Sequence, residues 1–179
     1  SFASFTKTDL RDEHAIEAAI DAIGGPIDKL FYCAGLPVSG FSPIDVLTVN
    51  FIAVRKMIVT VEPLLVDGGA IASISSDGGL GWEANLEPIF EWLACSDFAS
   101  SQAWCAERAD MLGDGYGFAK QALIVYTMWK GHELVTGRRI RWTLIGGQSF
   151  ERRVGVVDDS RVANLHEPRR SGRHQPLDD

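Results

Sequence analysis

Along the chain, segments in which hydrophobic residues recur at helical spacing alternate with short continuous apolar runs. This pattern predicts alternating helices and strands. Isoleucines recur at helical spacing between Asp12, which can cap a helix, and Gly24, which can end one. Residues 29–33 then form a short apolar run that is typical of a buried parallel strand. Similar runs at residues 70–75 and 140–145 predict two more strands.

Longer helical segments separate these runs. Ser42, Pro43 and Asp45 place a cap, a first-turn proline and a first-turn acid before a helix that we expect to end near Leu65. A second long helix is predicted over about residues 115–136. Strands and helices that alternate with short glycine-rich joints predict an α/β fold with a parallel sheet and right-handed crossovers.

Two stretches break this alternation. Residues 82–113 form an insertion in which we expect two helices, the second over about residues 102–112. Its tryptophans fit either an extension of the core or a lid or subunit contact, and both interpretations stay open: Trp82, Trp92 and Trp104. Residues 150–179 mix charged residues with Pro, Ser and Gly without any period, so we expect a disordered tail after a domain that spans residues 1–149.

Composition narrows the class of protein. The chain is 46% hydrophobic and 23% charged, with 17 basic against 24 acidic residues and a net charge of −7, which argues against a nucleic-acid-binding module. It contains no apolar run of membrane-spanning length and no apolar leader. The three cysteines are odd in number and lack C-x-x-C spacing, which predicts a reduced, cytoplasmic enzyme. The histidines are scattered, so we expect no metal site. We expect Cys33 to be a small buried residue.

Candidate chemistry lies where the predicted strands end, which is where ligands bind in open parallel sheets. Three segments of the chain fall at such strand ends: residues 33–35, the serine pair that ends with Ser76, and the loop that leads to Tyr116. Tyr116 and Lys120 are four residues apart, so they project from one helix face. An ammonium group beside a tyrosine stabilises its phenolate, and a nearby serine can bind a carbonyl oxygen. Taken alone, a tyrosine and a lysine at this spacing more often belong to an ordinary helix surface than to an active site.

These motifs, in this order, resemble the short-chain dehydrogenase/reductase family. The matching segments are Asp9-Leu10, Tyr32-Cys33-Ala34-Gly35, Val49-Asn50-Phe51, Ile74-Ser75-Ser76 and Tyr116-Gly117-Phe118-Ala119-Lys120. Within the family, the chain looks most similar to the bacterial 3α-hydroxysteroid dehydrogenase/carbonyl reductase branch. That branch also has Cys-Ala-Gly at the strand end and a helical insertion between its catalytic serine and tyrosine. The resemblance implies a partial Rossmann-type, doubly wound parallel sheet that lacks its first βαβ unit.

The resemblance also implies a role for each matching residue. Tyr116 would be the general acid/base, and Lys120 would hold the nicotinamide ribose and stabilise the phenolate. Ser76 would orient the substrate carbonyl. Asn50 would hold its helix and a water that relays protons to Lys120, although it could equally be a helix-interior residue that bonds to the backbone.

The implied cofactor is NAD or NADP. Asp9 and Leu10 would lie along the adenine, although Asp9 could equally be a helix cap. Ala34 and Gly35 would let the cofactor approach the backbone, although Gly35 could be only a turn residue. The activity implied is oxidation of an alcohol or reduction of a ketone, a hydroxysteroid or similar carbonyl compound, by a homodimer or homotetramer.

The sequence also departs from this family. It has no glycine-rich turn of the kind that places a pyrophosphate at a helix N-terminus, and the stretch after residue 149 matches nothing in the family. Two alternatives therefore stay open. The chain is an inactive fragment or pseudoenzyme that cannot bind cofactor, or it reduces another carbonyl class, such as an acyl or sugar carbonyl.

Overall fold

Three parallel strands form the sheet at the centre of the protein. The computed structural model describes residues 4–146. The strands are neighbours in the order β1-β2-β3, with β1 at Ile27–Tyr32, β2 at Leu65–Ile74 and β3 at Arg141–Ile145. Phe31, Ala72 and Thr143 lie in one row across the three strands. This arrangement confirms the predicted α/β class with a parallel sheet.

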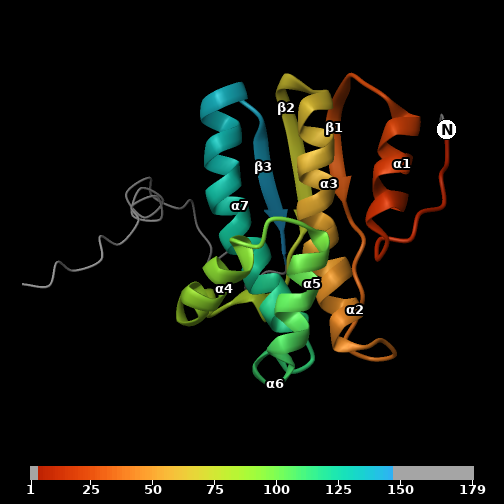
Figure 1. Cartoon of the computed structure of the whole chain (residues 1–179). Helices are drawn as coiled ribbons and strands as arrows, with labels where there is room; N and C mark the ends of the chain where they lie inside the picture. Colours follow the sequence, from red (N-terminus) through yellow and green to blue (C-terminus); the bar gives the residue numbers. More distant parts are fainter. Residues whose placement is uncertain (1–3, 147–179) are drawn as a thin grey trace, which may run out of the picture.

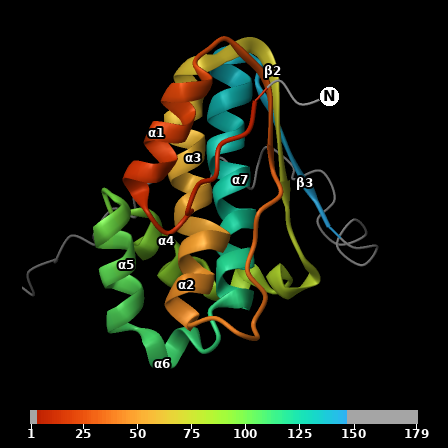
Figure 2. The same cartoon turned by 90° about the vertical axis from the view of Figure 1, so that its right-hand side faces the viewer.

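The long helices lie side by side over one face of this sheet. They are α1 (Glu13–Ile23), α3 (Ala53–Val61) and α7 (Tyr116–Arg138). Figure 2 shows the layers edge-on, and within residues 4–146 no helix covers the opposite face. The layer of helices therefore buries one face of the sheet and leaves the other open.

Local capping explains where the helices begin. The Asp12 carboxylate accepts hydrogen bonds from the first-turn amides of α1, and the Ser42 hydroxyl accepts one from Asp45 N at the start of α2 (Pro43–Leu47). A π-helical turn at Thr48–Ile52 joins α2 to α3. The predicted helix to Leu65 thus exists as three consecutive segments, and a 3-10 turn at Glu62–Leu64 ends it.

The expectation that residues 29–33 are a fully buried strand is wrong. Leu30 and Tyr32 face the helices, but alternate side chains of a strand point to opposite faces, so Lys29, Phe31 and Cys33 face outward. The Phe31 side chain is 64% exposed, and the Cys33 thiol is exposed rather than buried. The prediction of a buried strand assumed a sheet that is covered by helices on both faces.

The insertion at residues 82–113 adds to the core. It contains α4 (Leu86–Leu93), α5 (Phe98–Glu107) and α6 (Ala109–Leu112) after a 3-10 turn at Trp82–Asn85. The Trp92 ring is fully buried, with its centre 5.7 Å from that of Trp104 and 4.5 Å from that of Phe51. These contacts favour the interpretation of the insertion as an extension of the core.

Three further expectations concern the tail, a membrane-spanning helix and a metal site. The tail at residues 150–179 lies outside the described residues. Residues 4–146 include no helix that is long and apolar enough to cross a bilayer. The same residues include no group of three or more His, Cys, Asp and Glu side chains that could hold a metal ion.

Candidate active site

The side chains of Ser76 and Tyr116 converge on Gly78, just beyond the carboxyl end of β2. Ser76 begins a short 3-10 turn at Asp77–Gly79, and its hydroxyl accepts a hydrogen bond of 3.2 Å from Gly78 N. A methyl group added at Gly78 would lie 3.3 Å from Tyr116 Cε1 and 3.6 Å from Ser76 Oγ. The structure therefore places the hydroxyl and the phenol ring next to the same glycine.

Lys120 lies one turn further along α7 than Tyr116. Its Nζ donates a hydrogen bond of 2.8 Å to the Ile74 carbonyl and lies 5.7 Å from the centre of the Tyr116 ring. The side chain is buried, and this burial lowers the pKa of Lys120. No carboxylate of residues 4–146 lies within ion-pair distance of this ammonium group. Its positive charge is therefore directed at the tyrosine ring and the strand end.

Close packing of α7 on the turn after β2 holds these groups together. A methyl group at Gly79 would lie 2.9 Å from the Lys120 carbonyl oxygen and 2.7 Å from Ile124 Cδ1, too close for any larger residue. The sequence analysis did not single out Gly78 or Gly79. The signal available was a glycine pair directly after a strand that ends in serines.

Asn50 is buried in the π-helical turn and fixes the loop that follows β1. Its Oδ1 accepts a hydrogen bond of 2.7 Å from Leu36 N, and its Nδ2 donates one of 3.0 Å to Leu36 O. A methyl group at Gly35 would lie 3.2 Å from the same Oδ1. Asn50 therefore binds backbone, but across the fold rather than within its own helix. Its role in a proton relay to Lys120 stays a prediction.

The expected cofactor residues Ala34 and Gly35 are both exposed in this loop, at the same edge of the sheet as the end of β2. The buried Tyr32 hydroxyl donates a hydrogen bond of 2.7 Å to the Val49 carbonyl and so ties the end of β1 to the π-helical turn. The backbone at Ala34 and Gly35 is therefore both open and anchored at its two sides. This is the geometry that close approach of a ligand to the backbone needs.

Asp9 is bound by its neighbour Arg11. The Arg11 guanidinium donates hydrogen bonds of 3.0 and 2.8 Å to the two Asp9 carboxylate oxygens, and Arg11 N donates another of 3.0 Å. These bonds lower the pKa of Asp9 to about 2. Leu10 packs against the core. No contact among the described residues joins Asp9 to Tyr116 or Lys120.

The reacting end of this site fits the ribose of a nicotinamide dinucleotide. An ammonium group has three N–H donors, and among the described residues Lys120 uses one, so two remain for ribose hydroxyls. The open backbone at Gly35 allows a planar ring system to approach. The pyrophosphate end has no such match, because the sequence contains no glycine-rich turn that opens a helix.

No protein-family model matches the chain. Among curated proteins it is similar to a coniferyl-alcohol dehydrogenase of Pseudomonas sp. strain HR199, with 28% identity over 142 residues that cover 79% of this chain and 55% of the relative. The chain thus spans about half the length of this curated relative.

Solved structures share the fold. The 3-alpha-hydroxysteroid dehydrogenase of Pseudomonas sp. B-0831, complexed with NADH, superimposes with a TM-score of 0.64 and 18% identity over 92% of this chain and 68% of its own. A short chain dehydrogenase of Burkholderia cenocepacia J2315 in complex with NADP gives a TM-score of 0.52 and 22% identity over 78% and 50%. Together with the sequence match, these likenesses confirm the predicted resemblance to the short-chain dehydrogenase/reductase family.

Proposed function

We propose that this chain carries the reacting half of an NAD(P)-dependent oxidoreductase that interconverts an alcohol and a ketone. The observation that supports this most directly is the convergence of Ser76 and Tyr116 on Gly78, with the Lys120 ammonium 5.7 Å from the tyrosine ring. The similar proteins are dehydrogenases, and two of their structures hold NADH or NADP. The substrate class that we propose is a hydroxysteroid or a similar carbonyl compound.

A bound nicotinamide supplies the hydride in reduction and accepts it in oxidation. In reduction, Tyr116 Oη–H donates its proton to the carbonyl oxygen as negative charge develops there. In oxidation, the phenolate takes the proton from the alcohol. The buried Lys120 ammonium stabilises that phenolate, and the Ser76 hydroxyl holds the substrate oxygen between the two groups. Asn50 keeps the loop at Gly35 in place through its two bonds to Leu36.

A second candidate function is that of a non-catalytic relative that does not bind cofactor. It is favoured by one observation, the capture by Arg11 of the Asp9 carboxylate, which the resemblance places along the adenine. A third candidate keeps the same residues and reduces an acyl or sugar carbonyl. Cofactor titration distinguishes the second candidate from the first, and a substrate panel distinguishes the third.

The substitution Tyr116→Phe tests the proposal, because it removes the proton donor and keeps the ring. The measurement is cofactor-linked turnover on a panel of hydroxysteroids and aryl alcohols, in a protein in which a glycine-rich strand–turn–helix unit precedes residue 1. We expect turnover to fall by roughly 100-fold or more. Tyr126→Phe, on the same helix but in the core, is the matched control and should stay within a few-fold.

Turnover of Tyr116→Phe within a few-fold of the parent would contradict the assigned proton donor. Activity on acyl or sugar carbonyls alone would select the third candidate. We also propose that the active form is a cytoplasmic homodimer or homotetramer, and light scattering on the purified protein measures that mass directly.

A further inference from the structure

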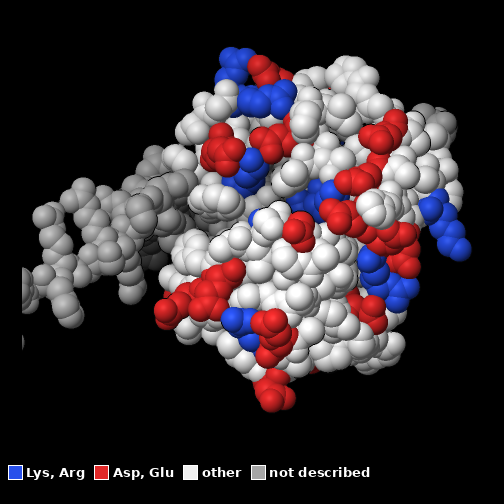
Figure 3. All heavy atoms as spheres, viewed as in Figure 1, with Lys and Arg blue, Asp and Glu red and all other residues white. Residues whose placement is uncertain are grey.

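A cavity lies on the helix-covered face, away from the group around Gly78. Its volume is about 270 Å³, slightly below the usual range for ligand pockets, so it suits only a small ligand. It lies between α1, α3 and the start of α5, and none of Ser76, Tyr116 and Lys120 lines it. Figure 3 views this face of the molecule and shows acidic and basic side chains mixed over it. Whatever binds in this cavity is independent of the proposed oxidoreductase chemistry.

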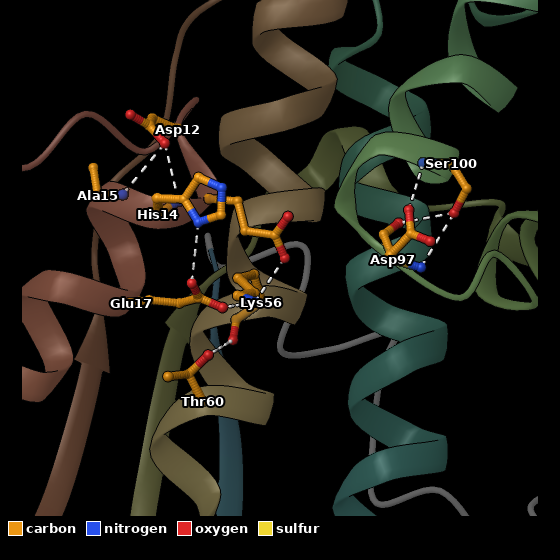
Figure 4. Close-up of polar contacts among 9 residues, drawn as sticks. Asp12, His14, Ala15, Glu17, Lys56, Thr60, Asp97 and Ser100 are labelled. Atoms are coloured by element: carbon orange, nitrogen blue, oxygen red, sulfur yellow. Dashed lines mark hydrogen bonds and ion pairs between the residues drawn. The ribbon is translucent and has the colours of Figure 1, made fainter.

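Two of the charged groups at this cavity are already paired. Lys56 Nζ donates hydrogen bonds to the carboxylates of Glu13, at 2.6 Å, and Glu17. Figure 4 shows Lys56 beside Glu17 and the Asp97 carboxylate turned toward Ser100. Asp97 caps α5, and its oxygens accept hydrogen bonds from Ser100 N and the Ser96 hydroxyl. These bonds occupy Lys56 and Asp97 within the protein.

Arg55 and Ser101 are the donors that remain. Arg55 makes one hydrogen bond, of 2.8 Å from Nη2 to the Cys95 carbonyl, and no carboxylate within residues 4–146 lies at ion-pair distance from it. The Ser101 side chain lines the cavity and is only 2% exposed. No side-chain hydrogen bond is found for its hydroxyl within residues 4–146. The hydroxyl is therefore free to donate a hydrogen bond to a ligand.

We propose that this cavity binds a small monocarboxylate with an apolar body. The planar guanidinium of Arg55 matches a carboxylate in two parallel hydrogen bonds, and Ser101 donates a third. Phe98 and Ile52 are buried at the cavity wall and supply apolar contact for the rest of the ligand. Arg55 is the cation at this cavity that has no carboxylate partner within residues 4–146, so it is the group that would attract the ligand's carboxylate. A phosphate dianion would bring a second charge close to Asp97 and is disfavoured.

The test is a titration of the 179-residue chain with sodium benzoate, followed by ¹H–¹⁵N NMR. We expect saturable shifts at the Phe98 and Ser101 amides and at Arg55 Nε–H, with a midpoint below about 10 mM. Benzyl alcohol, which is neutral and of similar shape, and inorganic phosphate should bind at least about 10-fold more weakly. Equal responses to benzoate and benzyl alcohol would overturn the proposal, as would the lack of a saturable shift.

Substitutions locate the site. Arg55→Gln should weaken benzoate about 10-fold or more, and Ser101→Ala roughly 3- to 10-fold. Arg141→Gln, on the exposed side of β3, is the matched control and should leave the midpoint unchanged. Arg55→Lys keeps the charge without the planar fork, so we expect it to weaken benzoate binding to an intermediate degree. An NMR spectrum that stays dispersed shows that each variant is folded.

Unchanged binding in Arg55→Gln would contradict the assignment. Shifts that depend on protein concentration and not on benzoate would show that a second copy of the chain occupies the cavity, and would also contradict it.

Discussion

The two ends of the candidate active site are built in different ways. At the reacting end, Ser76, Tyr116 and Lys120 come from neighbouring elements and their positions are fixed by packing of α7 on the turn after β2. At the nucleotide end, Ala34 and Gly35 are exposed backbone, and the Asp9 carboxylate is held by Arg11. The first end is already packed in the arrangement that the proposed proton transfer needs, whereas the second offers a ligand few free donors or acceptors.

The proposed chemistry and the proposed cofactor binding therefore depend on separate parts of this fold. The candidate reacting groups lie only on α7 and on the turn that follows β2. Binding of a dinucleotide also needs groups that contact its pyrophosphate, and this sequence contains no glycine-rich turn for that purpose. The predictions below test each end separately.

The largest expected effect is on cofactor binding by the chain itself. Calorimetric titration of the 179-residue protein with NADH and NADPH should show no saturable binding at micromolar concentrations, because only the ribose end of the site is present. We also expect a low melting temperature, since one face of the sheet carries exposed residues such as Phe31. Saturable micromolar binding of either nucleotide would show that the nucleotide end is complete without a glycine-rich turn.

Removal of the ammonium group is the next test of the reacting end. In a protein that binds cofactor, Lys120→Ala should lower turnover by about 10-fold or more and raise the pH at which alcohol oxidation appears, because the phenolate loses its stabilising charge. Lys120→Arg keeps a positive charge and should restore part of the pH profile. The measurement is the pH dependence of kcat for the three proteins. An unchanged profile in Lys120→Ala would mean that Lys120 acts only in binding.

A smaller effect is expected from the packing that joins α7 to β2. Gly79→Ala puts a methyl group 2.9 Å from the Lys120 carbonyl, so the helix and the turn must separate. We expect a loss of about 1–3 kcal/mol in the free energy of unfolding, measured by urea denaturation. Gly117→Ala is the matched control, because its methyl group would meet its nearest neighbour at 3.4 Å and alanine favours a helix. Equal stability of the two variants would contradict the close approach.

The sequence predicts local features of this molecule well. The caps at Asp12 and Ser42 depend on residues within one turn, and both exist as predicted. The shared helix face of Tyr116 and Lys120 follows from their spacing. The approach of Ser76 to Tyr116 needed one further step, the rule that parallel strands present their carboxyl ends at one edge.

Other features depend on contacts that no local pattern reveals. The exposure of Cys33 follows from an uncovered sheet face, whereas the apolar run around it is typical of a buried strand. The bonds from Asn50 to Leu36 join segments 14 residues apart, so sequence alone left its role open. The cavity at Arg55 and Ser101 combines residues from three helices that share no motif.

The smallest expected effect concerns the carboxylate at the nucleotide end. Arg11→Gln removes the guanidinium that holds Asp9, so the pKa of Asp9 should rise from about 2 toward its ordinary value near 3.8. The measurement is an NMR titration of the Asp9 carboxyl group. Because this pKa is depressed in the folded state, the stability that the pair contributes is present above the ordinary pKa and is lost as the pH falls through about 2. Asp97, which Arg11 does not contact, is the internal control, and its titration should not move. A pKa of Asp9 that stays near 2 in the variant would show that other groups hold this carboxylate, and that its release for a ligand is not controlled by Arg11.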